Sequence, residues 1–246
     1  MQITQRPSPN RSIGRQGQIP DFIVCHITGG SFTSAINTIL NAANQVSYHF
    51  VVGRDGAIVQ AVNIEDTAWS NGTTNSGDNR DNRHSTIPEV RTRRRNANQF
   101  TVSIGFADSS GGELAAAQLT AGVDLIRHIR SEVRRIYGFD IPIVRSNIVG
   151  HFEINPLTRA NCPGPRFPFN EILRQLESGM VGASPNLPIE TLPVSLPESP
   201  QGPSNWAREA WDWAVGLGIT DGTNPQGTPT REQMITMLHR YYKATA

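Results

Sequence analysis

The chain has 246 residues, a formal net charge of +1 and a hydrophobic content of 37%. This length fits one domain of ordinary size with a smaller appendage, and the composition is that of a globular protein. The balanced charge excludes binding to nucleic acid through a large basic excess, so we predict no nucleic-acid partner.

The N-terminal segment, MQITQRPSPNRSIGRQGQIPDF, contains no apolar run of seven or more residues. A secretory signal or a membrane anchor needs such a run. We therefore expect a protein that is made in the cytoplasm without a signal peptide and that has no membrane partner. Its two cysteines, Cys25 and Cys162, give no reason to expect a disulfide.

Strands and helices are predicted to alternate in the order strand, helix, hairpin, strand, helix, strand. Short apolar runs rich in β-branched residues predict the strands, and the turn GRDG between two such runs predicts the hairpin. Apolar positions three or four residues apart predict two amphipathic helices, of which the longer ends before Gly138. We predict an α/β (α+β) domain with a mixed central β-sheet flanked by helices, from stretches 21–27, 31–43, 47–62, 100–107, 115–137 and 147–151.

The segment 71–98 is polar, rich in Asn, Gly and Arg, and has no clear period. It contains six arginines, at positions 80, 83, 91, 93, 94 and 95. Two interpretations remain open, a solvated loop or a loop that faces an anionic polymeric substrate.

A proline-rich segment divides the chain. Prolines at 185, 188, 193, 197, 200 and 203 favour extended chain that cannot bury a core. We therefore predict three parts: a catalytic domain over residues 1–178, a linker over 179–203 and a small helical module over 204–246.

Three side chains at predicted strand ends or in an adjoining loop can bind a metal, namely His26, His151 and Cys162. Catalytic zinc sites use three protein ligands of these types and leave a fourth position open. Each of the three could equally be a buried side chain with satisfied hydrogen bonds, and spacing alone does not decide.

Four motifs in order, IVCHITGG, SYHFVVGRDGAIVQ, AWSNG and VGHFEINPLTRANCPGPRF, resemble the zinc-dependent type 2 N-acetylmuramoyl-L-alanine amidases. This family includes the peptidoglycan recognition proteins, and the resemblance covers about residues 20–178. It implies Zn²⁺ as the cofactor, with His26, His151 and Cys162 as its ligands. It also implies a catalytic Tyr48, which stands immediately before the HF of the hairpin strand; we expect His49 to point to the opposite face and to be structural.

The resemblance implies hydrolysis of the amide bond between N-acetylmuramic acid and the first L-alanine of the stem peptide. Zinc lowers the pKa of a water molecule to roughly 7, so that hydroxide is available at neutral pH. The Tyr48 hydroxyl would help to stabilise the oxyanion that forms.

Two positions depart from the family pattern. Many relatives carry a lysine where this chain has Ala160, and others carry a glutamate where it has Gly105; no lysine precedes Lys243. The role of the lysine is vacant or falls to Arg159, a donor that cannot shuttle protons. Glu153 is a substitute base if the strand continues past His151; otherwise it is a surface carboxylate or a partner of a ligand.

For the substrate groove we predict Thr28, Trp69 and Asn71, together with Arg159. Trp69 could equally belong to the core, since an indole with a satisfied N–H is ordinary interior.

The C-terminal part predicts two helices, the first carrying Trp206 and Trp213 and the second beginning with a capping box of Thr230 and Gln233. Between them, GITDGTNPQGTPTRE resembles the S-layer homology motif. This implies binding to a secondary cell-wall polymer; a single copy suggests weak binding or self-association. The alternative is a helical hairpin that serves only in dimerisation.

Together these features predict a modular peptidoglycan hydrolase of the phage-endolysin type, which acts at the bacterial cell wall after release. Two alternatives remain, a catalytically inactive peptidoglycan-recognition protein and a cytoplasmic amidase that recycles muropeptides.

Overall fold

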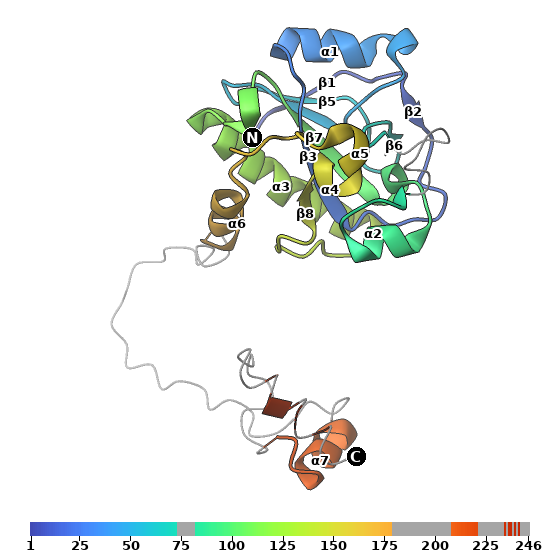
Figure 1. Cartoon of the computed structure of the whole chain (residues 1–246), viewed down its shortest axis with the longest axis vertical. Coiled ribbons are helices and arrows are strands. Elements are labelled where there is room, and N and C mark those ends of the chain that lie inside the picture. Colours follow the sequence, from blue (N-terminus) through green and yellow to red (C-terminus); the bar gives the residue numbers. More distant parts are fainter. Residues whose placement is uncertain are drawn as a thin grey trace, which may run out of the picture. The chain divides into compact units, whose positions relative to one another are not determined.

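The computed structural model describes residues 1–72, 82–178 and 208–220, together with the single residues 234, 236, 237, 239 and 241 (Figure 1). The chain divides into two compact units, Met1–Pro185 and Asn186–Ala246. The predicted linker, residues 179–203, lies outside the described residues.

A mixed six-stranded sheet forms the centre of the first unit. Its strand order is β1-β5-β4-β7-β3-β8, and all neighbouring pairs are parallel except β4 and β5, which form the predicted hairpin. The predicted mixed sheet flanked by helices is therefore confirmed. The strands are β1 Ile3–Gln5, β3 Phe22–Ile27, β4 Phe50–Val52, β5 Ile58–Gln60, β7 Thr101–Phe106 and β8 Ile148–Gly150; β2 Arg11–Ser12 and β6 Thr67–Ala68 form a separate antiparallel pair.

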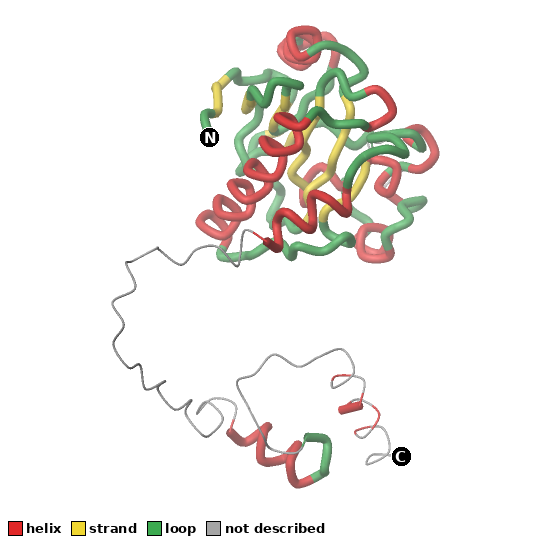
Figure 2. The backbone as a smooth tube through the Cα atoms, turned by 90° about the vertical axis from the view of Figure 1, so that its left-hand side faces the viewer, coloured by secondary structure: helices red, strands yellow, loops and turns green. Residues whose placement is uncertain are grey.

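One face of the sheet packs on the long helix α3, Ala116–Tyr137, which crosses it in Figure 2. The predicted apolar positions Val123, Ile126, Ile129 and Val133 are buried there. Gly138 ends the helix with a φ of 68°, a conformation that glycine adopts without strain. Helix α6, Phe169–Ser178, buries Ile172 and Leu176 in the same core.

Shorter helices cover the opposite face. Helix α1, Phe32–Leu40, lies in the stretch where the sequence predicts a helix; Ser31 accepts the Ser34 amide at its start, and the helix packs on β4. Helices α2, Pro88–Arg93, and α4, His151–Ile154, pack with even-numbered residues of β3 in a second cluster. Short α5, Pro156–Arg159, follows α4, and the 3₁₀ turns of the described residues include Ala42–Asn44, Ala97–Phe100 and Ser110–Gly112.

Two expectations about this unit are wrong. The sequence predicts a loop over 71–98, but this segment contains α2 and the first two residues of a 3₁₀ turn. Six helical residues span fewer than two turns, too few to show a period. The strand that includes Ile148 was expected to reach His151, but it ends at Gly150 and His151 begins a helix.

In the second unit, helix α7, Arg208–Gly216, lies within the first predicted helix. The described residues between 234 and 241 are also helical, and the Tyr241 ring lies 6.1 Å from that of Trp213 between centroids. Trp206, the capping box and the S-layer-type motif beyond Thr220 lie outside the described residues. Within the described parts of the chain, no helix combines the length and the apolarity needed to cross a bilayer.

Candidate metal centre and active site

His26 lies on a central strand, on the face of the sheet that α2 and α4 cover. Side chains of β3 alternate between the two faces, so that Cys25 points into the α3 core while Val24 and His26 point to the other side. His26 is completely buried there, although its imidazole is polar. Burying a polar ring is costly unless its nitrogens find partners, and only Nδ1 of His26 has one among the described residues.

His151 meets His26 because β8 lies beside β3 and the last residue of β8, Gly150, pairs with Cys25, the residue before His26. The two Nδ1 atoms are 2.9 Å apart, and the ring centroids are 4.4 Å apart. At most one of these facing nitrogens carries a proton, because two N–H groups would repel each other at this distance. At least one of the two Nδ1 atoms therefore has a lone pair instead of a proton.

Cys162 comes from the loop after α5 and closes the third side. Its Sγ accepts a hydrogen bond from the amide of Ile27, at 3.4 Å, and its carbonyl accepts one from the amide of Phe152, at 2.8 Å. The first bond ties the sulfur to the residue after His26, and the second ties its backbone to the residue after His151. Cys162 is half-buried, as expected for a side chain at the rim of a site.

These three side chains fit a zinc ion. One donor atom from each side chain lies within 4.8 Å of the donor atoms of the other two. The Nε2 atoms of both rings are buried without a hydrogen-bond partner among the described residues. Two imidazoles and a thiol are a donor set of the type that zinc prefers.

The protonation of the two rings suits metal binding. Burial, followed by electrostatic interaction with the neighbouring His151 and Arg159, lowers the pKa of His26 well below 6.5. Burial lowers the pKa of His151 to about 4, although the backbone carbonyl of Asn71 opposes the shift. Both rings are neutral at pH 7, as metal ligands must be. Burial raises the pKa of Cys162, opposed by the Ile27 amide and Arg159.

Tyr48 stands beside this cluster. Its ring centroid is 5.0 Å from that of His26, and its Cδ2 would lie 2.9 Å from a Cβ built on Gly105. Burial and the nearby Cys162 raise the pKa of the Tyr48 hydroxyl, so the hydroxyl keeps its proton at neutral pH. The tyrosine is therefore placed to donate a hydrogen bond next to the metal-binding group.

Arg159 lies at the exposed side of the cluster. A pocket of about 400 Å³ is lined by Leu157, Thr158, Arg159, Ala160, Asn161 and Cys162. The Arg159 side chain is exposed, and its charge contributes to the lowered pKa values of His26 and His151. The pocket is therefore lined by both the fixed positive charge of Arg159 and the thiol of Cys162.

The other predicted groove residues take different places. Thr28 is half-buried at the end of β3, and its Cγ2 lies beside Tyr48 over Gly105. Trp69 is half-buried and donates from Nε1 to the Ser12 hydroxyl at 3.0 Å. The Asn71 side chain is in the interior, where its Nδ2 donates to the Thr101 hydroxyl at 3.0 Å.

Glu153 does not lie on the same face as His151. The expectation assumed a continuing strand, in which residues two apart share a face, but in a helix such residues point in nearly opposite directions. The Glu153 carboxylate instead accepts from the Gly150 amide at 2.8 Å and pairs with Arg145 at 2.7 Å.

Comparison with known proteins decides the family. The model of the N-acetylmuramoyl-L-alanine amidase family (Amidase_2) matches residues 16–165. The chain belongs to this amidase family. No curated protein sequence matches it.

Two solved structures show the same fold. A point mutant of PlyL has a TM-score of 0.52 and 20% identity, covering 73% of this chain and 100% of its own. The PlyG catalytic domain has a TM-score of 0.50 and 20% identity, covering 75% and 99%. A selenomethionine derivative of AmpD is also similar, with a TM-score of 0.49 and 21% identity, covering 71% and 93%.

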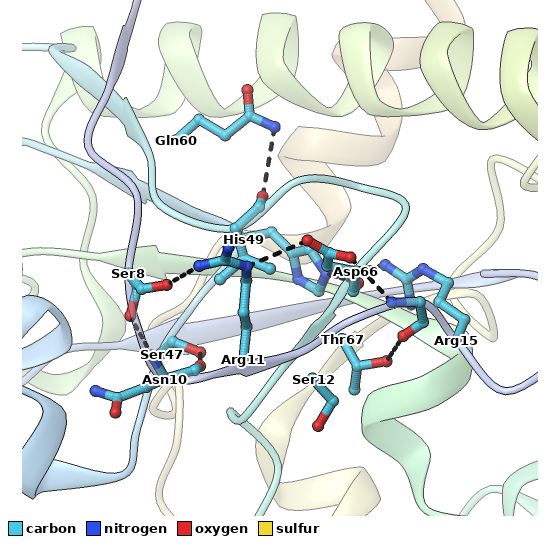
Figure 3. A network of polar contacts seen from close by, with 12 residues as sticks. Ser8, Asn10, Arg11, Ser12, Arg15, Ser47, His49, Gln60, Asp66 and Thr67 are labelled. Carbon is cyan, nitrogen blue, oxygen red and sulfur yellow. Dashed lines mark hydrogen bonds and ion pairs between the residues drawn. The ribbon is translucent and has the colours of Figure 1, made fainter.

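Within this amidase, the sequence did not predict the role of the N-terminal segment. The residues on either side of Tyr48, Ser47 and His49, both bond to this N-terminal segment. The Ser47 hydroxyl donates to the Asn10 carbonyl, and Arg15 Nη2 lies 2.8 Å from His49 Nε2 (Figure 3). His49 Nδ1 accepts from the Ser103 amide at 3.0 Å, so His49 is buried and structural in the way we expected.

Arg15 is the least expected residue of this network. Its side chain is almost fully buried, and Nη1 donates to the carbonyls of Gln99 and Thr101, each at 3.0 Å. Burial lowers the pKa of Arg15 to about 10, which still leaves it charged at pH 7. Only its position in a polar N-terminal segment is visible in the sequence, and that gives no sign of burial.

Two arginines of the segment 71–98 have structural roles. Arg93 pairs with Asp21, and its guanidinium lies 4.5 Å from the centroid of the Phe100 ring. Arg91 donates to the Ser85 carbonyl at 2.7 Å. Arg80 lies outside the described residues. Both arginines therefore contribute to the local structure of this segment, and Arg91 is also exposed.

Proposed function

We propose that this amidase is a zinc hydrolase that cleaves the amide bond between N-acetylmuramic acid and L-alanine of the peptidoglycan stem peptide. The observation that carries the proposal is the convergence of His26, His151 and Cys162 within 4.8 Å, beside a protonated tyrosine. Family membership supports the choice of bond.

In this proposal His26, His151 and Cys162 hold the metal. Bound zinc would act as a Lewis acid that activates a water molecule at neutral pH and polarises the scissile carbonyl. The two neutral imidazoles offer lone pairs because burial suppresses their protonation. The amides of Ile27 and Phe152 hold Cys162 in place before any metal arrives.

Tyr48 and Arg159 act on the substrate side. The Tyr48 hydroxyl keeps its proton and can donate to the carbonyl oxygen as negative charge develops there. Arg159 contributes a fixed positive charge at the pocket rim and can orient an anionic part of the substrate. Thr28, beside Tyr48, lines the same side of the site.

Metal analysis combined with wall digestion tests the proposal. Purified protein should contain one zinc per chain and release free L-alanine amino groups from purified walls, and a chelator should stop the release until zinc is restored. Bound zinc without any new amino group would favour the inactive recognition protein instead. Protein without zinc that still releases amino groups would contradict the metal assignment.

We further propose that the second unit directs the enzyme to the cell wall, so that the protein acts as a lytic endolysin after release from its site of synthesis. The support is the order of catalytic domain, proline-rich segment and S-layer-type motif in the sequence. Such a motif suits a secondary cell-wall polymer as partner. A cytoplasmic recycling amidase would have no use for it.

A further inference from the structure

Glu153 has a role that neither the family nor the motif assigns. It is the third residue of the four-residue helix α4, whose first residue is His151. Its Oε2 accepts a hydrogen bond at 2.8 Å from the amide of Gly150, the residue immediately before His151. The carboxylate therefore holds the backbone at the point where the chain turns from β8 into the helix.

Arg145 fixes the same carboxylate from the other side. Its Nη2 lies 2.7 Å from Glu153 Oε2, and its Nη1 donates to the Ile148 carbonyl on β8 at 3.1 Å. The guanidinium also lies 3.8 Å from the centroid of the Phe169 ring. Because Arg145 is itself anchored to β8 and to the Phe169 ring, the Glu153 carboxylate that it binds has little freedom to move.

Helix α4 depends on such contacts. A helix of four residues is too short to be stable by itself, and the amides at its start have no partner within the helix. Glu153 satisfies the Gly150 amide, and the Cys162 carbonyl satisfies the Phe152 amide at 2.8 Å. The Glu153 carbonyl in turn accepts from the Ser85 hydroxyl at 2.7 Å. These bonds fix the backbone around His151 and so set the direction in which the imidazole side chain points.

We propose that Glu153 is a positioning residue that orients His151 toward the metal, and that it is not the general base. The proposal rests on the proposed role of His151 as a zinc ligand. Glu153 acts through the Gly150 amide and does not touch the reacting atoms. Partners that orient metal ligands commonly change metal affinity by about 10- to 100-fold when they are removed.

A positioning residue and a general base predict opposite orders of hydrolytic activity for two conservative variants of the full chain. Glu153→Gln keeps the length and the accepting oxygen, whereas Glu153→Asp keeps the charge but is one methylene too short to reach the Gly150 amide. A positioning role predicts near wild-type zinc affinity and hydrolysis for Glu153→Gln. It predicts zinc affinity about 10- to 100-fold lower for Glu153→Asp and Glu153→Ala, with hydrolysis largely regained at saturating zinc.

Zinc affinity is measured by competition with a chromophoric chelator, and hydrolysis by release of amino groups from walls. Glu171→Gln is the matched control, since Glu171 pairs with Arg174 on the surface of α6, and it should change neither quantity. Circular dichroism checks folding; if Glu153→Ala does not fold, the order of the Gln and Asp variants still decides.

Two results would overturn the positioning role while leaving the proposed function intact. One is Glu153→Gln losing hydrolysis at unchanged zinc affinity while Glu153→Asp retains more, which is the pattern of a general base. The other is wild-type zinc affinity in all three variants. Wild-type protein that takes up no zinc would contradict the proposed function itself, and the positioning role with it.

Discussion

At the scale of single residues, Cys162 is the proposed ligand whose replacement is most informative. Serine preserves its size but has no thiolate to offer. We expect Cys162→Ser to lose more zinc affinity than the roughly 100-fold that removing an outer partner costs, and to abolish wall hydrolysis. Zinc competition and amine release measure the two effects.

The chain supplies its own control for this substitution. Cys25, the other cysteine, is adjacent to His26 in the sequence but points into the α3 core. Cys25→Ala should reduce stability by creating a small cavity and should leave zinc affinity unchanged. Full hydrolysis by Cys162→Ser would refute the assignment of the sulfur as a ligand.

Tyr48 is expected to affect the rate and not the metal. Its ring, which lies beside His26, is kept by phenylalanine and only the protonated hydroxyl is lost, so Tyr48→Phe should retain zinc and remain folded. Removing one donor to a developing oxyanion typically costs about 100- to 1000-fold in kcat. We expect a loss of this size, measured at saturating zinc; a kcat within the error of wild type would exclude Tyr48 as a donor.

The cluster of His26, His151 and Cys162 was predictable because the types and order of these residues are written in the motifs around them. The positions of Glu153 and Asn71 were not predictable in the same way. The place of Glu153 depends on a strand ending at Gly150, a boundary that apolar residues on both sides conceal. Asn71 is buried by partners more than 25 residues away in the sequence, among them Thr101.

At the scale of elements, the central strand β7 leaves space for the Tyr48 ring at Gly105. A Cβ at this position would lie 2.9 Å from Tyr48 Cδ2 and 3.1 Å from Thr28 Cγ2, so one of these side chains must move. We expect Gly105→Ala to displace the tyrosine and to reduce kcat by about 10- to 100-fold, since small misplacements of catalytic groups have effects of this size.

Gly30→Ala is the control for this substitution. It lies in the loop after β3, and its Cβ would make only an ordinary contact at 3.5 Å with Ser34 Oγ. Its kcat should equal that of wild type. A fully active Gly105→Ala would show that the Tyr48 ring does not need its present place against β7.

The elements that the sequence predicted show a period, a paired turn or an apolar run rich in β-branched residues. Helix α3 and the β4–β5 hairpin are examples. Strand β1 has three residues and α2 has six, and neither length gives a recognisable pattern. Their stability comes from pairing and burial, which only the folded chain provides.

At the scale of the whole molecule, three buried histidines make stability depend on pH. Burial lowers the pKa values of His26, His49 and His151 below 6.5, so the unfolded chain binds more protons than the folded chain in weak acid. The contribution of these three imidazoles to the free energy of unfolding is fully present above about pH 7. It falls as the pH drops through 6.5 toward the pKa values of the folded state. For His151, with a pKa of about 4, the loss reaches about 2 kcal/mol at pH 5.

Thermal unfolding of the zinc-free protein at several pH values measures this dependence. The midpoint should be constant above about pH 7 and should fall steadily between about pH 6.5 and pH 5. A midpoint that stays constant across this range would mean that the three imidazoles are not held neutral by burial.

The two compact units predict separable activities. Removing residues 179–246 should leave the hydrolysis of soluble muropeptides unchanged, because the cluster lies entirely within the first unit. Sedimentation with purified walls should show a loss of wall binding of about 100-fold or more, as expected when one of two linked binding sites is lost. Unchanged wall binding would favour the recycling amidase.

The central claim concerns the bond that is cut. Mass spectrometry of peptidoglycan digested by the zinc-loaded full-length protein tests it most directly. We predict intact glycan chains whose N-acetylmuramic acid carries a free lactyl carboxylate, together with stem peptides that begin with unmodified L-alanine. Cleavage within the glycan or inside the stem peptide, or no cleavage by protein that holds zinc, would contradict this account.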